Sequence, residues 1–167
     1  NETLGEIREE YSMYLGGDCD VSHIAALWEL GYLPVHFKSI PEGTLVPMGV
    51  PVLTVYNTLP EFYWITNFLE TIISTLLWKP MTSATIAHQY KKNLLSWAKK
   101  TDEENVSFVD FQGHDFSMRG LDSVDAAISS GLGHATSFLG SDSLPVIHGA
   151  RKYYAENGSV VGCVNAT

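Results

Sequence analysis

The stretch VSFVDFQGHDFSMRG, residues 106–120, decides the fold class predicted for this chain. Its first part, Val106 to Phe111, is an apolar run rich in residues that favour strands. The loop Gly113 to Gly120 follows, and after it a Ser-, Asp- and Ala-rich stretch has the composition of a helix. A strand that leads through a polar loop into a helix is the repeating unit of an α/β fold.

The same order of elements continues to the end of the chain. Strands are predicted at about 106–111, 136–139 and 159–164, with helices at about 122–134 and 143–155. Parallel strands joined by right-handed helical crossovers are the expected arrangement. Either an open doubly wound sheet or part of a βα barrel would fit this pattern.

The residues before this stretch predict helices packed on an antiparallel sheet. A first helical pattern stops at Gly16-Gly17, and Asp20 can cap a second helix that ends at Gly31. Alternating apolar and polar residues at 35–38, and residues that favour strands at 45–46 and 52–56, then predict short strands joined by turns. This pattern favours antiparallel pairing over βαβ units.

Two further helices are predicted before the polar linker at 101–105. Thr58-Leu59-Pro60-Glu61 resembles a capping box at the start of the first helix, and Lys79-Pro80 ends it. Thr82 or Ser83 can cap the second. We therefore divide the chain into an α+β part at 1–100 and an α/β part at 106–167.

Composition narrows the class of protein. The chain has 167 residues, 45% of them hydrophobic and 17% charged, which is typical of one globular domain with a real core. Its net charge is −9, and Lys91, Lys92, Lys99 and Lys100 are expected on the solvated side of a helix, so we expect no nucleic-acid partner. No apolar run approaches the ~20 residues that span a bilayer, and no membrane association is expected.

The two cysteines and the two ends give further expectations. Cys19 and Cys163 form no CxxC pair, which favours free thiols in a reducing compartment, the cytoplasm. The chain starts with Asn1 inside a helical pattern and stops just after a strand pattern. We therefore expect it to be the middle of a longer protein.

The candidate binding residues follow predicted strands, because α/β folds bind ligands at the C-terminal ends of their strands. Arg119 offers a planar charged fork for a phosphate, or it forms an ion pair with Asp115 or Asp122. Phe116 stacks a flat ring, or it belongs to the core. Asp142 is a binding residue, or it caps the following helix.

The six histidines predict no metal site. They show no HExxH or comparable spacing. We interpret His114 and His134 as hydrogen-bonded structural residues.

The chain resembles the middle part of the nicotinamide phosphoribosyltransferases of bacteria, phages and animals. The most specific matches are His114-Asp115-Phe116 to Arg119-Gly120 and Gly140-Ser141-Asp142. Ser117-Met118 depart from the pattern, since animal members carry Gly-Tyr there. Other matches occur in similar order and spacing: Pro41-Glu42-Gly43, Asn57-Thr58, Tyr63-Trp64, Thr66-Asn67, Glu70-Thr71 and Trp78-Lys79-Pro80.

The resemblance implies a reaction and a role for each candidate. The family makes nicotinamide mononucleotide and pyrophosphate from nicotinamide and phosphoribosyl pyrophosphate, a step of NAD salvage. Phe116 would stack on the pyridine ring, Arg119 would lie beside the phosphates, and Asp142 would accept a hydrogen bond from the carboxamide NH2. A carboxylate repels the carboxylate of nicotinate, which favours nicotinamide as the substrate.

The resemblance also implies what lies outside the chain. The family's catalytic histidine is expected just after Thr167, so no catalytic residue is assigned here and this chain alone should be inactive. Magnesium would accompany the pyrophosphate, and ATP is a possible coupled activator. The implied fold is the irregular α/β barrel of type II phosphoribosyltransferases, in a homodimer with a shared active site and with residues 1–100 in the dimerisation domain. Nicotinate phosphoribosyl transfer and a non-catalytic scaffold remain the alternatives.

Overall fold

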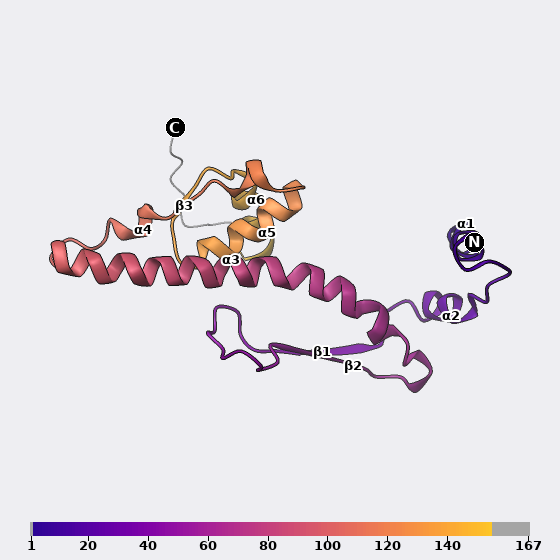
Figure 1. Cartoon of the computed structure of the whole chain (residues 1–167). Coiled ribbons are helices and arrows are strands. Elements are labelled where there is room, and N and C mark those ends of the chain that lie inside the picture. The colour runs from indigo at the N-terminus through magenta and orange to yellow at the C-terminus, as the bar shows by residue number, and fades with distance from the viewer. Residues whose placement is uncertain (1, 155–167) are drawn as a thin grey trace. The chain divides into compact units, whose positions relative to one another are not determined.

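This computed structural model describes residues 2–154, which form helices and short strands (Figure 1). The chain divides into two compact units, Asn1–Glu70 and Thr71–Thr167. Both helices and sheets are present, as predicted, whereas the division at the 101–105 linker stays a prediction. The first unit contains α1 (Glu2–Leu15), α2 (Ser22–Leu30), β1 (Val35–Ser39), β2 (Leu53–Asn57), the 3-10 helix η1 (Pro60–Phe62) and the start of α3 (Ile65–Thr101).

The second unit holds the candidate binding residues. Its helices surround a short pair of parallel strands. Beyond the remainder of α3, its elements are α4 (Val109–Gln112), β3 (His114–Asp115), the 3-10 helix η2 (Ser117–Gly120), α5 (Val124–Ala135), β4 (Gly140–Ser141) and α6 (Pro145–Tyr153).

Local sequence signals set the ends of the first two helices. α1 stops before Gly16, which has a φ of 75° that glycine adopts without strain. The Asp20 side chain accepts a 2.9 Å hydrogen bond from the Ser22 N–H at the start of α2. Gly31, also at a φ of 75°, ends α2 and donates its N–H to the Leu27 carbonyl. The predicted ends at Gly16-Gly17 and Gly31 are therefore confirmed. Asp20 is not the cap of α2, because the N-cap residue is Val21, which makes no side-chain capping bond.

The predicted antiparallel pairing is also confirmed. β1 pairs with β2 from Val35↔Asn57 to Ser39↔Leu53. On one face of the hairpin the rings of His36 and Tyr56 stack, with their centroids 5.0 Å apart. Such cross-strand ring pairs stabilise a sheet that has only two strands.

The predicted helix end at Lys79-Pro80 is wrong, because α3 runs through Pro80. Proline inside a helix removes one hydrogen bond and costs about 3 kcal/mol. Packing within the second unit offsets that cost. The Ser83 hydroxyl donates a 2.7 Å hydrogen bond to the Ser130 carbonyl of α5, and Gly133 lies so close that an added Cβ would be 2.4 Å from the Pro80 oxygen.

The capping box predicted at residues 58–61 is not formed. η1 begins at Pro60, and its N-cap residue Leu59 has no side chain that could accept a hydrogen bond. Proline at the first position suits the start of a helical turn because its missing N–H would have no partner there. The sequence pattern at 58–61 therefore predicted the start of a helical turn correctly, but the capping interaction that it predicted is wrong.

Two of the three strands predicted in the α/β part are wrong. Within 106–111, Val109 begins the short helix α4 and is fully buried. At 136–139, helix α5 ends in a turn, and the strand starts only at Gly140. Short apolar runs do not distinguish a buried strand from a buried helical turn, which explains both errors. The strand predicted at 159–164 lies outside the described residues.

The parallel arrangement itself is confirmed for β3 and β4. Their register pairs His114 with Gly140 and Asp115 with Ser141. The crossover between them contains α5, which differs from the predicted range of 122–134 by two residues at its start and one at its end.

Glycines let α5 and α6 pack closely next to this sheet. A Cβ on Gly131 would lie 2.2 Å from Val146, and one on Gly149 would lie 2.3 Å from Ile128. Ala127 of α5 and Val146 of α6 are both buried. The predicted helix at 143–155 is confirmed as α6, with slightly shorter bounds.

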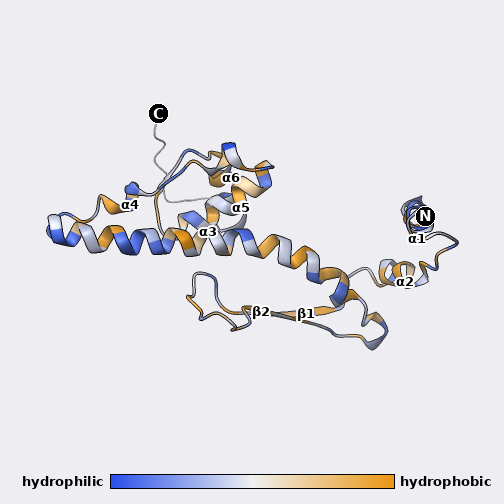
Figure 2. Cartoon of the chain, in the orientation of Figure 1, coloured by the Kyte–Doolittle hydropathy of each residue, from blue (hydrophilic) through white to orange (hydrophobic). Residues whose placement is uncertain are grey.

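Large apolar side chains remain exposed along α3, where Figure 2 shows orange bands between the blue ones. An apolar surface of this kind is characteristic of faces that other protein covers. Among the described helices, none is long and apolar enough to cross a membrane. The exposed set on α3 is Phe68, Ile72, Leu76, Trp78, Met81, Ile86, Tyr90 and Trp97.

Candidate functional site

The parallel pair of β3 and β4 brings two of the predicted binding residues to one edge of a sheet. Phe116 directly follows β3, and Asp142 directly follows β4. The Asp142 N–H donates a 2.9 Å hydrogen bond to the Asp115 carbonyl, which extends the ladder to the strand ends. The two candidates are 26 residues apart in sequence and meet because their strands are parallel and in register.

His114 connects these two side chains. Its Nε2 lies 3.0 Å from Asp142 Oδ1, and its ring lies 4.9 Å from the Phe116 ring at an interplanar angle of 42°. The prediction that His114 is a hydrogen-bonded histidine is confirmed, but the sequence did not reveal Asp142 as its partner. No local pattern could have done so, because the contact depends on the register of β3 against β4.

Asp142 is not the N-cap of the following helix. The N-cap residue of α6 is Leu144, which makes no side-chain capping bond. The Asp142 carboxylate instead pairs with His114, and both side chains are largely shielded, with exposed fractions of 24% and 15%. This pair places a carboxylate next to an aromatic ring, a suitable arrangement for a flat polar ligand.

Asp115 fixes the loop that carries Phe116. It is 5% exposed, and its Oδ1 accepts a 2.9 Å hydrogen bond from the Ser117 N–H. Its Oδ2 accepts a longer hydrogen bond, 3.4 Å, from the Ser141 hydroxyl of β4. A buried carboxylate needs such donors, and here they tie the loop to the neighbouring strand. The sequence predicted only a possible ion pair for this residue.

Phe116 and Arg119 are both exposed, at the start of η2 and within it. Phe116 is 50% exposed, which excludes a core position in this part of the structure. Arg119 lies in η2, and among residues 2–154 it forms no ion pair, neither with Asp115 nor with Asp122. A ring face and a guanidinium group are therefore accessible at the edge, and their roles as ligand contacts stay predictions.

A second histidine supports the other end of β3. His134 Nε2 lies 3.1 Å from the Gly113 carbonyl oxygen, and its ring stacks on Phe138. Gly113 packs against the same ring, since an added Cβ would lie 2.5 Å from Phe138 atoms. His134 is therefore the hydrogen-bonded structural histidine that was predicted.

The prediction that Lys91 lies on the solvated side of a helix is wrong. Its Nζ lies 2.8 Å from Asp110 Oδ1 and 2.5 Å from the Ser137 carbonyl, and its side chain is only 27% exposed. Lys91 therefore joins α3 to the residues before β3 and β4 and does not belong to the solvated face. Lys92, Lys99 and Lys100 are exposed, as predicted.

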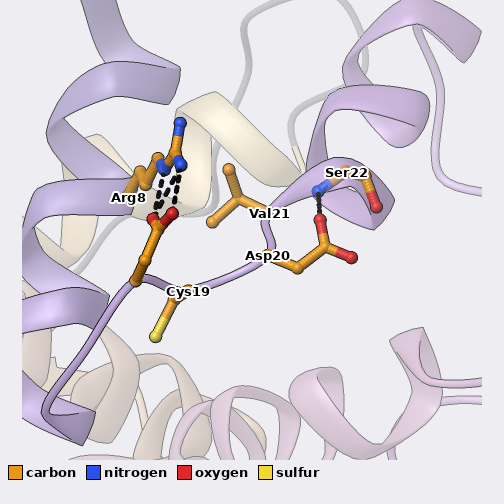
Figure 3. Close-up of a pocket in the computed structure, with 6 residues that line it drawn as sticks. Arg8, Cys19, Asp20, Val21 and Ser22 are labelled. Atoms are coloured by element: carbon orange, nitrogen blue, oxygen red, sulfur yellow. Dashed lines mark hydrogen bonds and ion pairs between the residues drawn. The ribbon is translucent and has the colours of Figure 1, made fainter.

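The first unit contains a separate surface hollow of about 380 Å³ at the turn from α1 to α2 (Figure 3). Arg8 makes two hydrogen bonds to Asp18 Oδ1, at 2.9 and 2.7 Å, and one to Oδ2, at 2.7 Å. These bonds raise the pKa of Arg8, and its positive charge is paired with the Asp18 carboxylate. Arg8 is therefore already paired within the hollow. The residues that the structure describes contain no cluster of acids, histidines or cysteines suited to a metal ion.

Three curated relatives share the name nicotinamide phosphoribosyltransferase. The protein from Acinetobacter baylyi is 50% identical over 151 residues, 90% of this chain. The proteins from Xanthomonas campestris and Mycoplasma genitalium are each 32% identical, over 74% and 84% of this chain. The chain spans only 30%, 26% and 32% of the length of these three relatives, and no family model matches it. On these similarities, the chain belongs to the nicotinamide phosphoribosyltransferase family and corresponds to about 30% of the length of its members.

Proposed function

We propose that the complete protein containing this chain transfers a phosphoribosyl group from phosphoribosyl pyrophosphate to nicotinamide, giving nicotinamide mononucleotide and pyrophosphate. The observation that carries the proposal is the position of Phe116 and Asp142 at one sheet edge, where both contact His114. The relatives' shared name supports the same reaction. This reaction is a step of NAD salvage.

In the proposed complex, the pyridine ring stacks on Phe116 while the carboxamide NH2 donates to Asp142. A carboxylate has about four lone-pair positions, so it can accept from a carboxamide in addition to its bond with His114. Nicotinate would place a second negative charge at this position and leave buried groups unpaired. That difference is about 1–3 kcal/mol, or roughly 5- to 150-fold in favour of nicotinamide.

The bond that forms joins the pyridine nitrogen to the anomeric carbon as pyrophosphate leaves. The transition state resembles an oxocarbenium ion, so the protein acts by positioning the ring and stabilising the leaving charge. We assign Arg119 to the phosphates because its exposed guanidinium lies one helical turn after Phe116. The family's catalytic histidine is proposed just after Thr167.

Magnesium would neutralise charge on the pyrophosphate. The described residues offer no cluster of three ligands for it, so we place the ion on the substrate and assign it no protein ligand here. ATP as a coupled activator likewise remains part of the proposal, without a residue assigned to it.

We further propose that β3 and β4 are the first strands of the irregular α/β barrel of type II phosphoribosyltransferases. A homodimer with a shared active site is proposed with it. The exposed apolar side chains of α3 support covering of that helix by other protein, and the relatives' greater length supports further strands beyond this chain. A cytoplasmic location fits the free thiol of Cys19 and stays part of the proposal.

The function is tested by a product assay on the complete protein with each base in turn. We expect nicotinamide mononucleotide and pyrophosphate from nicotinamide, and a much lower kcat/KM with nicotinate. Greater activity on nicotinate would favour nicotinate phosphoribosyl transfer instead. If calorimetry detected nicotinamide binding and no product formed, the protein would be a binding scaffold that keeps the fold.

A further inference from the structure

We infer that His114 is a positioning residue for base recognition: it orients the Asp142 carboxylate toward the carboxamide and restricts the rotation of the Phe116 ring. The inference rests on the proposed function. Among the described side chains, His114 is in contact with both Phe116 and Asp142, through a 3.0 Å hydrogen bond to the acid and a 4.9 Å ring contact.

The backbone holds the His114 ring in one place. In the parallel register His114 lies opposite Gly140, and an added Cβ there would come 2.3 Å from His114 Nδ1. The ring therefore lies against bare backbone on its Nδ1 side, while Nε2 is directed at Asp142. A larger residue at position 140 could not coexist with this ring position.

In its hydrogen bond with Asp142, His114 acts as the donor. Asp142 is a carboxylate and can only accept when ionised, so His114 Nε2 must carry the donated proton. A donor on one oxygen fixes the plane of the carboxylate and with it the direction in which the other lone pairs point. Side chains that orient a binding group in this manner are often as important as the binding group itself.

The ring contact gives His114 a second effect. Phe116 is half exposed. The tilted contact with His114, at 42°, limits the angles that the Phe116 ring can adopt. His114 therefore contributes to both the stacking and the hydrogen bonding of the base, and loss of His114 should weaken binding of nicotinamide more than the chemical step.

The test compares two amide variants that differ in reach. In His114→Gln the side-chain NH2 can occupy about the position of Nε2 and donate to Asp142, whereas in His114→Asn it is one carbon too short. We expect His114→Asn to raise the KM for nicotinamide roughly tenfold with kcat little changed, which is the pattern of lost binding. His114→Gln should stay within about threefold of the wild type.

The matched control is His148→Asn on the exposed side of α6, which should leave both constants unchanged. Equal effects of His114→Asn and His114→Gln, or no effect of either, would overturn the inference. A fall in kcat without a rise in KM would also overturn it. If the wild-type protein made no nicotinamide mononucleotide, the proposed function itself would fail, which is a separate outcome.

Discussion

Replacing Gly140 by alanine should push the His114 ring out of place. The added Cβ would lie 2.3 Å from Nδ1, 3.0 Å from Cε1 and 3.2 Å from Cγ of His114, so three ring atoms would be too close. Ordinary contact begins near 3.4 Å, which means that the ring must retreat by about 1 Å or the strands must separate. Either movement misaligns the 3.0 Å bond to Asp142.

The cost of Gly140→Ala follows from two effects. Overpacking of a tight contact costs about 1–3 kcal/mol of folding free energy. A weakened hydrogen bond to a charged group adds a loss of up to about 1.5–3 kcal/mol, part of which appears in substrate binding. We therefore expect the free energy of unfolding to fall by about 2 kcal/mol and the KM for nicotinamide to rise roughly tenfold.

Urea denaturation and initial-rate kinetics on the complete protein measure the two effects. Gly120→Ala is the control for stability, because a Cβ at that position meets nothing within 4 Å and should leave the urea midpoint unchanged. If Gly140→Ala unfolded at the wild-type urea concentration with an unchanged KM, the close approach of Gly140 to His114 would have no energetic importance and the reasoning would be refuted.

Two further predictions concern the helices. Gly133→Ala would place a Cβ 2.4 Å from the Pro80 carbonyl oxygen and 3.1 Å from the Ala84 nitrogen. These are backbone atoms that cannot move aside, so the urea midpoint should fall by the equivalent of about 1–3 kcal/mol, and an unchanged midpoint would contradict this packing of α5 on α3. The hydrogen bond from the Ser22 N–H lowers the pKa of Asp20 below its ordinary value of 3.8. The resulting stabilisation of α2 is complete above that value and is lost as the pH falls through the folded pKa; an NMR titration of the Asp20 carboxyl that gave 3.8 or higher would contradict it.

The parts of the fold that were predictable depend on neighbours in sequence. The C-terminal ends of α1 and α2 follow from Gly16 and Gly31, whose N–H groups donate to carbonyls four residues earlier. The prediction failed where distant packing decides the outcome. α3 continues through Pro80 because α5 packs on it, and the residues of α5 in that contact lie about fifty positions later. Val109 is buried in a helical turn and not in a strand, a choice that its own apolar neighbours do not determine.

In the candidate site, too, the contacts between residues distant in sequence could not be predicted. The rule that ligands bind at strand ends selected Phe116 and Asp142, although two strands were placed several residues too early. The link through His114 and the burial of Asp115 could not be predicted, because both depend on the register between β3 and β4. A histidine and an aspartate 28 positions apart give no local signal of contact.

The central claim is that Asp142 recognises the carboxamide of nicotinamide, and one ratio tests it most directly. That ratio is kcat/KM for nicotinamide over kcat/KM for nicotinate, measured in the complete protein for the wild type and for Asp142→Ala. The account predicts that the substitution lowers the ratio roughly 10- to 100-fold, mainly through loss of activity with nicotinamide. An unchanged kcat/KM for nicotinamide in Asp142→Ala would contradict it.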